Sequence, residues 1–337
     1  MVTGVSPSSI GYSIALEIAS QRPAILIIAS RTASKLDAVA HEISKYYHLV
    51  RVEKVILDLA CIESVKLAAS QINRYTEQID VLINNAGVSL SHRDPITTPD
   101  GSTVDLQFLI NHLGPFLLTE LLLPKILTAG ARSAKGETRI VNLSSHGHRL
   151  SPIRFSDYQF SRGIFDSVPE DERPSSKAAE GFLRTIDGYP GFLGYAQSKT
   201  ANILHSLEMS KLFQGKQTGI IALSVHPGSI QTELSRSLDE VGKKMIEGTA
   251  PGGAWKTIDQ GAATALVAAF DPRLAEVDVG VSVCGYMSDC QLADHLAAPW
   301  AKDHISAARL WQESERMLGI TSVLKSYEPS KRSDISQ

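Results

Sequence analysis

The chain has 337 residues, of which 43% are hydrophobic and 20% are charged, so it can bury a large globular core. Its formal net charge of −3 excludes a polybasic nucleic-acid scaffold and gives no reason to expect an anionic membrane partner. Cys61, Cys284 and Cys290 form no CxxC pair, which excludes a disulfide framework and favours a reducing compartment.

Short apolar, β-branched runs alternate with amphipathic stretches along the chain. Helices are predicted at 12–20, 33–45 and 200–213, and strands at 25–30, 51–57, 81–84, 139–144, 220–225 and 279–284. Strands this apolar suit a parallel sheet that is covered on both faces. The alternation therefore predicts an α/β, doubly wound parallel sheet, in which ligands bind at the carboxyl ends of the strands.

Three segments depart from this alternation. Only Met1 and Val2 precede Thr3-Gly4, so the first strand is expected to be truncated. The stretch 151–193 has no assignable strands and is long enough to be a functional insert. The polar stretch 320–337 is expected to be a flexible tail. No apolar run reaches the ~18 residues of a transmembrane helix.

A glycine-containing loop, Thr3-Gly4-Val5-Ser6-Pro7-Ser8-Ser9-Ile10-Gly11, precedes the first predicted helix. A strand, a glycine loop and a helix N-terminus together present backbone N–H groups to a pyrophosphate. Gly4 and Gly11 permit close approach of the backbone. On this loop alone, a plain strand-to-helix turn explains the residues equally well.

Polar residues follow the next three strands. Arg31 closes the second strand, where it can pair with a ribose 2′-phosphate, and Lys35 lies one turn further on; a solvated surface arginine is the alternative. Asp58 can meet an adenine amino group or can cap the following helix. Asn84-Asn85-Ala86-Gly87 is either a strand-ending turn or a loop beside a bound dinucleotide.

Tyr195 and Lys199 are four residues apart in a predicted helix, so they share one face. A nearby cation favours the phenolate and is expected to bring the pKa of a tyrosine towards the working pH. Ser144-Ser145 ends the fifth strand, where a hydroxyl can hydrogen-bond a carbonyl oxygen beside the tyrosine. Asn111 lies inside a predicted helix, where it is either functional or a hydrogen-bonded helix asparagine.

Two histidines flank Gly147 without a third ligand at metal spacing, so we predict no metal site and interpret His146 and His148 as part of a loop that lines the pocket. We interpret His226-Pro227-Gly228, with Thr232 beyond it, as a turn that can lie beside the amide group of a nicotinamide. The chain has no Gly-x-Ser-x-Gly and no Walker loop, so hydrolase and NTPase functions lack support.

The motifs described above, from the glycine loop to Thr232, occur in the order that is typical of the short-chain dehydrogenase/reductase family. The chain resembles this family from Thr3 to about Gly319. Within that family the chain is similar to the retinol-dehydrogenase and WW-domain-oxidoreductase group. The residues that carry this second resemblance are Ala29-Ser30-Arg31, Ile153-Arg154-Phe155-Ser156-Asp157, Tyr195 to Asn202, Gln260-Gly261-Ala262-Ala263-Thr264 and Asp289-Cys290-Gln291.

The resemblance implies one Rossmann-like domain over 1–319, with about seven strands and a substrate-site insert at 151–193. It implies hydride transfer between NADP(H) and a carbonyl or alcohol, with Tyr195 as acid/base. Lys199 would lower the tyrosine pKa and hold the nicotinamide ribose, Ser145 would polarise the substrate oxygen, and Asn111 would support a water relay. The cofactor residues would be Thr3, Gly4, Ser6, Ile10, Gly11, Arg31, Lys35, Asp58, Asn85, Ala86, Gly87, Tyr195, Lys199, Pro227, Gly228 and Thr232.

The leading hypothesis is an NADP(H)-dependent oxidoreductase that acts on a lipophilic ketone or alcohol in small-molecule biosynthesis. The insert 151–193 and the segment 234–255 would form the substrate walls, although core packing also explains the five insert phenylalanines. One alternative is a non-catalytic NADP(H)-binding regulatory protein, and another is lyase or epimerase chemistry. We expect a cytoplasmic protein with no nucleic-acid partner; homo-oligomerisation and peripheral membrane association stay open.

Overall fold

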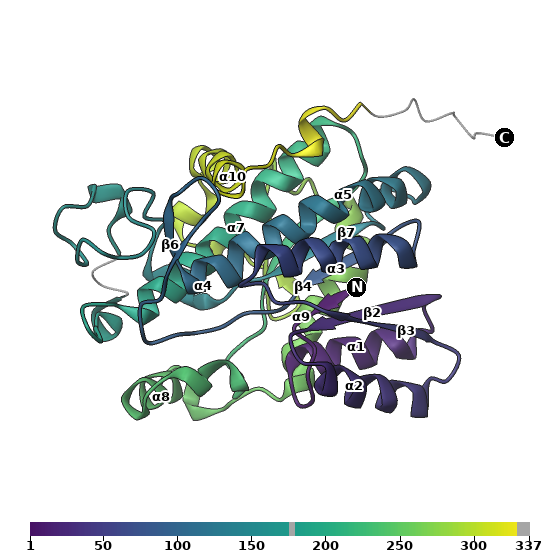
Figure 1. Cartoon of the computed structure of the whole chain (residues 1–337), viewed down its shortest axis with the longest axis horizontal. Helices are drawn as coiled ribbons and strands as arrows, with labels where there is room; N and C mark the ends of the chain where they lie inside the picture. The colour runs from purple at the N-terminus through teal and green to yellow at the C-terminus, as the bar shows by residue number, and fades with distance from the viewer. Residues whose placement is uncertain (175–178, 329–337) are drawn as a thin grey trace.

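The centre of the protein is an eight-stranded sheet with the order β10-β9-β8-β7-β4-β1-β2-β3 (Figure 1). The computed structural model describes residues 1–174 and 179–328. All neighbouring strands are parallel except β10, which runs antiparallel to β9 and closes one edge. The strands are β1 Val2–Thr3, β2 Ile25–Ser30, β3 Arg51–Ile56, β4 Val81–Asn84, β7 Arg139–Leu143, β8 Ile221–His226, β9 Tyr286–Ser288 and β10 Gln291–Leu292. The predicted doubly wound α/β fold is confirmed, with a two-residue first strand.

One strand prediction is wrong. The β-branched run 279–284 is a turn, and β9 begins only at Tyr286. Gly280 and Gly285 have φ values of 88° and 75°, so the chain turns within the run and again directly after it. Val279 and Val283 pair with each other across this turn, and Val281 is 63% exposed.

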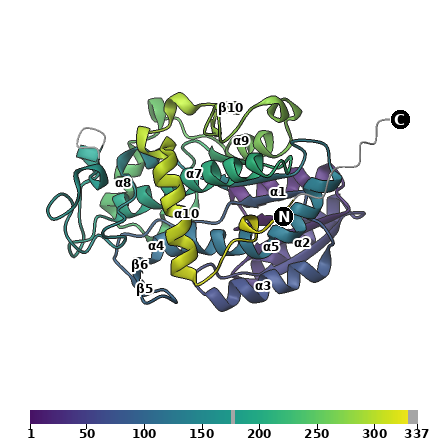
Figure 2. The ribbon, with the colours of Figure 1, turned by 90° about the horizontal axis from the view of Figure 1, so that it is seen from above.

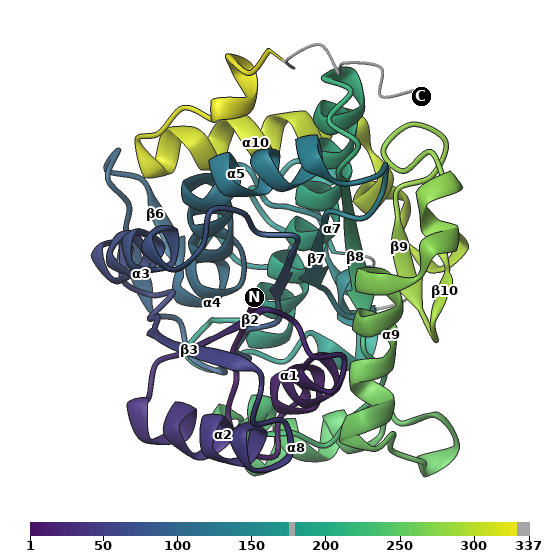
Figure 3. The same ribbon diagram turned by 90° about the vertical axis from the view of Figure 1, so that its right-hand side faces the viewer.

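Helices cover both faces of the sheet, as Figure 3 shows end-on. One face carries α1 Ile10–Ser20, α2 Ala33–Tyr46 and α9 Ile258–Phe270. The other carries α3 Ile62–Tyr75, α5 Gly114–Arg132 and α7 Gly191–Gly215, and α10 His304–Leu318 packs across α7 (Figure 2). The helix α8 Glu240–Glu247 lies apart, at the lower left of Figure 1.

Shorter elements connect these layers. A small antiparallel hairpin, β5 Pro95–Thr97 with β6 Thr103–Asp105, leads into α4 Leu106–Phe108 and a π-helical turn at Leu109–Leu113. The 3-10 turns are η2 His146–Leu150, η3 Glu170–Glu172, η4 Glu180–Phe182, η5 Glu233–Ser237, η6 Pro251–Gly253, η7 Pro272–Glu276, η8 Asp294–Leu296, η9 Pro299–Lys302 and η10 Val323–Lys325.

The sheet separates two hydrophobic clusters, one under each helix layer. Ile14, Leu36 and Ala265 belong to the cluster on the α1 side, whereas Phe116, Ile140 and Leu204 belong to the cluster on the α5 side. Within the described part of the chain, the stretch Leu106–Arg132 is long and apolar enough to cross a membrane, but 89% of its most apolar window is buried in this second cluster. Burial of this kind is typical of a core helix.

The insert 151–193 has its own buried centre. The Arg154 guanidinium donates to Asp157 Oδ2 at 2.7 Å and lies over the Phe160 ring, and both charged side chains are almost completely buried. Arg309 lies over the ring of Phe155. Packing within the protein therefore accounts for Phe155 and Phe160.

The first part of the expected tail packs against the domain. Leu324 is buried, the Ser322 N–H donates to Glu315 Oε1 at 2.7 Å, and Lys325 Nζ donates to Glu315 Oε2 at 2.6 Å. These contacts tie η10 to α10. Residues 329–337 of the expected tail lie outside the described residues.

Candidate functional site

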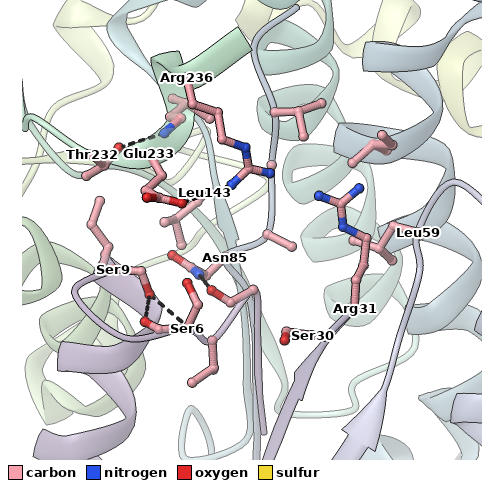
Figure 4. A pocket seen from close by; sticks show the side chains of 18 of the residues that line it. Ser6, Ser9, Ser30, Arg31, Leu59, Asn85, Leu143, Thr232, Glu233 and Arg236 are labelled. Atoms are coloured by element: carbon pink, nitrogen blue, oxygen red, sulfur yellow. Dashed lines mark hydrogen bonds and ion pairs between the residues drawn. The ribbon is translucent and has the colours of Figure 1, made fainter. Parts of the chain in front are cut away.

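A pocket of about 490 Å³ lies where the central parallel strands end. Its wall includes residues that directly follow β1, β2, β3, β4 and β8, together with the last residue of β7. Figure 4 shows the side chains of Arg31, Asn85 and Leu143, which come from separate elements, around the same pocket. The pocket thus occupies the position at which a doubly wound sheet binds its ligands.

The glycine loop forms one wall. Gly4 has a φ of 72°, and a Cβ added there would lie 2.6 Å from the Ala86 Cα, so only glycine fits. Ser9 caps α1 by accepting a hydrogen bond from the Tyr12 N–H, and its hydroxyl donates to Ser6 O at 2.7 Å. The N-terminal end of α1 is therefore ordered at the pocket, where it fits a pyrophosphate.

Thr3 lies behind this wall, where it fixes the loop that follows β4. Its Oγ1 accepts hydrogen bonds from the N–H groups of Asn85 and Ala86, at 3.1 and 3.2 Å. The Asn85 amide donates to Thr3 O at 2.8 Å. These bonds hold residues 85–87 against the glycine loop, so both segments line the same side of the pocket.

Basic side chains gather at the end of β2. Arg31 is exposed and, in Figure 4, points into the pocket; Lys35 on α2 also lines it. From the facing wall, η5 contributes Glu233 and Arg236. Glu233 Oε2 lies 3.7 Å from Lys35 Nζ and 3.3 Å from Arg236 Nη1.

Tyr195 stands near the N-terminal end of α7, with Ser145 beside it. The Ser145 hydroxyl lies beside the phenol and accepts the Gly147 N–H at 3.0 Å. Burial raises the pKa of Tyr195 to about 12, and the neighbouring Ser145 hydroxyl only partly opposes this increase. The expected lowering of the tyrosine pKa is thus not found, because the effect of burial is larger than that of Ser145.

Lys199 lies one turn after Tyr195 on the same face of α7, with its Nζ 5.6 Å from the centre of the Tyr195 ring. This Nζ donates to Leu143 O at 3.0 Å. Burial lowers the pKa of Lys199 to about 8. The Ser144 hydroxyl donates to Lys199 O at 2.7 Å, so Ser144 anchors α7 and leaves Ser145 facing the tyrosine.

Asn111 lies in the π-helical turn between α4 and α5. Its amide accepts from the Val88 N–H at 2.8 Å and donates to Val88 O at 2.9 Å and to Ser198 Oγ at 2.9 Å. The side chain therefore joins the loop after β4 to α7 beside Lys199. Turns with π-helical geometry are frequent at functional sites.

The two histidines near Ser145 do not line the pocket, contrary to prediction. His148 is fully buried; its Nε2 accepts the Ala298 N–H at 3.0 Å, so its Nδ1 carries the proton and donates to Ser145 O at 2.6 Å. Burial lowers the pKa of His148 to about 4, which keeps the ring neutral. His146 stacks on His226, with ring centres 3.7 Å apart. Among the described residues, no group of three or more His, Cys, Asp or Glu side chains has the arrangement of a metal site.

The structure brings most of the predicted cofactor residues to one pocket. The residues that line the pocket are Gly4, Ser6, Ile10, Arg31, Lys35, Asp58, Asn85, Ala86, Gly87, Tyr195, Lys199, Pro227 and Thr232. Thr3, Gly11 and Gly228 support the wall from behind; a Cβ on Gly228 would lie 2.5 Å from the Lys256 side chain. The sequence did not indicate Glu233 and Arg236 as pocket residues, because no periodic pattern distinguishes them from surface charges.

A smaller cavity, of about 20 Å³, lies between the insert and α8. Ile186, Phe192 and Leu238 are among its apolar walls, and Phe182 packs edge-on against Phe192. Arg184 and Asp239 join the two segments through hydrogen bonds of 2.8 and 2.5 Å. The described part of the insert therefore borders this cavity rather than the larger pocket.

The chain is similar to known oxidoreductases over most of its length. A family model described as short chain dehydrogenase matches residues 1–165. The short-chain dehydrogenase TIC 32 A, chloroplastic, of Brassica napus is 34% identical over 94% of this chain and 88% of its own length. Human retinol dehydrogenase 13 is 34% identical over 95% of this chain and 84% of its own length.

Solved structures show the same arrangement of elements. A protein of Mycobacterium paratuberculosis described as putative and uncharacterised is 28% identical, with a TM-score of 0.62 over 95% of this chain and 92% of its own. The NADPH-bound carbonyl reductase from chicken fatty liver is 19% identical, with a TM-score of 0.52 over 80% of this chain and 89% of its own. The second likeness shows the fold alone.

Proposed function

The chain belongs to the short-chain dehydrogenase/reductase family, in its retinol-dehydrogenase-like group, and on this basis we propose that it is an NADP(H)-dependent oxidoreductase. Its substrate would be a lipophilic ketone or aldehyde, or the corresponding alcohol. The observation that carries this proposal is the Tyr195 phenol at the pocket wall, with the Ser145 hydroxyl and the Lys199 ammonium beside it. A non-catalytic cofactor-binding protein has no need of this arrangement.

The proposed chemistry divides between the cofactor and the side chains. When bound, the nicotinamide supplies or accepts a hydride. With its pKa at about 12, Tyr195 is protonated at neutral pH and can donate its phenolic proton to a carbonyl oxygen. Ser145, held by the Gly147 N–H and by the His148 contact to its carbonyl, would orient that oxygen. Lys199 would stabilise the resulting tyrosinate.

The NADP(H) preference is proposed from the residues around the end of β2. Arg31 and Lys35 offer two cations on the pocket wall, and no Asp or Glu lies within residues 29–32 to bind a free ribose 2′-hydroxyl.

The substrate is proposed to enter between the insert and the segment that carries η5 and α8. The apolar side chains of Ile186, Phe192 and Leu238 lie where these two segments meet, and they would have to move apart to admit a lipophilic substrate, because the cavity between them is only about 20 Å³. The proposed location is the cytoplasm, where cysteines without a CxxC pair stay reduced; the similar Brassica protein is described as chloroplastic.

The pKa of Lys199 predicts the pH dependence of carbonyl reduction. Tyr195 stays protonated below about pH 12, whereas Lys199, with a pKa of about 8, loses its charge as the pH rises through that value. We therefore expect kcat/KM for reduction to fall above about pH 8, by up to about tenfold per pH unit for a single essential proton. A profile that stays flat from neutrality to pH 10, with circular dichroism showing an intact fold throughout, would contradict this role of Lys199.

The Arg184–Asp239 ion pair provides a test of the substrate walls. Its hydrogen bonds lower the pKa of Asp239 to about 2, and Asp239 also caps α8 by accepting the Gly242 N–H. Asp239→Asn keeps a capping side chain but removes the ion pair. We expect KM for a lipophilic substrate to rise about two- to fivefold at saturating NADPH, in keeping with an exposed pair. An unchanged KM would show that the insert and α8 do not shape the substrate site.

A further inference from the structure

We propose that Glu233 is a specificity-determining residue for the cofactor, because it forms ion pairs with two cations that could bind a 2′-phosphate. Its carboxylate would compete with the phosphate for Lys35, and it would keep Arg236 in an ion pair until the phosphate binds. This inference rests on the proposed function, since it assumes that NADP(H) binds in the larger pocket.

The geometry places one carboxylate between two cations from different elements. Lys35 belongs to α2, whereas Glu233 and Arg236 both belong to η5, about two hundred residues later in the chain. Glu233 Oε2 lies 3.7 Å from Lys35 Nζ and 3.3 Å from Arg236 Nη1. Figure 4 shows Arg31 and Arg236 entering the same pocket from opposite walls, with the Glu233 carboxylate near Arg236. The contact between Glu233 and Lys35 therefore bridges the two walls of the pocket.

The contact is weak enough to be exchanged. The side chains of Lys35, Glu233 and Arg236 are 44%, 68% and 50% exposed, so water and salt screen both pairs. A 2′-phosphate carries up to two negative charges and three acceptor oxygens, whereas Glu233 offers one charge and two oxygens. The phosphate is therefore the stronger partner for Lys35, and the planar guanidinium of Arg236 suits it for a bidentate contact. NADH has no 2′-phosphate and gains nothing from this exchange.

The ends of the segment that carries η5 are fixed independently of Glu233. Ser91 Oγ donates to Ser237 O at 3.0 Å, and the Lys256 N–H donates to Ser229 O at 2.9 Å. The exchange thus needs rotation of the Glu233 and Arg236 side chains rather than displacement of the whole segment. The same segment carries Leu234 and Ser237, which also line the pocket, so the exchange takes place on a wall that the cofactor shares with η5.

The test is a binding titration of the intact protein with NADPH and with NADH, monitored by cofactor fluorescence. Glu233→Gln keeps the size of the side chain and removes its charge. We expect the Kd for NADPH to fall about two- to fivefold, the range of one or two exposed ion pairs, and the Kd for NADH to change by less than about twofold. In a Lys35→Met background the gain from Glu233→Gln should shrink, since the competition for Lys35 is gone.

Glu240→Gln is the matched control, because Glu240 is an exposed acid on neighbouring α8 that pairs with Lys243 and does not line the pocket. It removes the same charge and should leave both Kd values unchanged. An unchanged Kd for NADPH in Glu233→Gln, an equal gain with NADH, or an equal gain in Glu240→Gln or in the Lys35→Met background would overturn the inference. If the wild-type protein binds NADH as tightly as NADPH, it is the proposed NADP(H) preference itself that fails.

Discussion

Replacing Tyr195 with Phe should lower turnover by about 10²–10⁴-fold, the usual cost of losing a general acid. Only the hydroxyl is removed, so the ring keeps its place beside Ser145 and Lys199 on α7. Carbonyl reduction then lacks its proton donor, whereas the pocket wall that would hold the cofactor is unchanged. The measurement is steady-state kcat on a verified substrate, with the Kd for NADPH determined in parallel.

Ser144→Ala is a useful companion to this variant. Ser144 precedes Ser145, but its hydroxyl donates to the backbone of Lys199 and not to the phenol. We expect Ser144→Ala to lower stability by about 0.5–1.5 kcal/mol, the net contribution of one hydrogen bond, because Lys199 O keeps its backbone partner within α7. The variant should reduce turnover far less than Tyr195→Phe does. Turnover near the wild-type level in Tyr195→Phe would refute the acid/base role of this tyrosine.

Replacing Arg31 with Asp should erase or invert the preference for NADP(H). A charge-assisted contact between the guanidinium and a 2′-phosphate contributes ~1.5–3 kcal/mol, which corresponds to a roughly ten- to hundredfold preference in the wild type. The introduced carboxylate repels the phosphate and can accept a hydrogen bond from the free 2′-hydroxyl of NADH. The measurement is the ratio of kcat/KM with NADPH to kcat/KM with NADH at one ionic strength, because salt screens exposed charges.

The matched control is Arg74→Asp, which makes the same charge change at an exposed position of α3 that does not line the pocket. It should leave the cofactor ratio unaltered. A wild-type enzyme that uses both cofactors equally, or a ratio that Arg31→Asp leaves unchanged, would show that Arg31 is only a surface charge.

The sequence was sufficient to predict the fold wherever an apolar run was bounded by turn residues. The runs ILIIAS and VLIN are β2 and β4 at the predicted bounds, because strands buried on both faces must be apolar throughout. The run 279–284 is also rich in β-branched residues, yet it forms a turn and not a strand, because Gly280 and Gly285 adopt positive φ angles. Composition alone cannot separate these two outcomes, because positive φ at a glycine is decided by tertiary packing.

The same distinction applies to the site. The spacing of Tyr195 and Lys199 places them on one helix face, as the structure has them. The effect of the fold on their pKa values was not predictable, because it comes from burial by elements far away in the sequence. Glu233 was missed for a related reason, since only the folded chain brings η5 across the pocket to Lys35.

Hydride transfer can be followed with NADPH that carries deuterium at the transferring position of the nicotinamide. The intact protein would be incubated with this cofactor and a panel of lipophilic ketones, and the products analysed by mass spectrometry. We expect an alcohol that bears deuterium on its carbinol carbon, formed in step with NADPH consumption and nearly absent with Tyr195→Phe. Tight binding of NADPH without its consumption by any of these ketones, or conversion of a substrate while the cofactor is left unchanged, would contradict it.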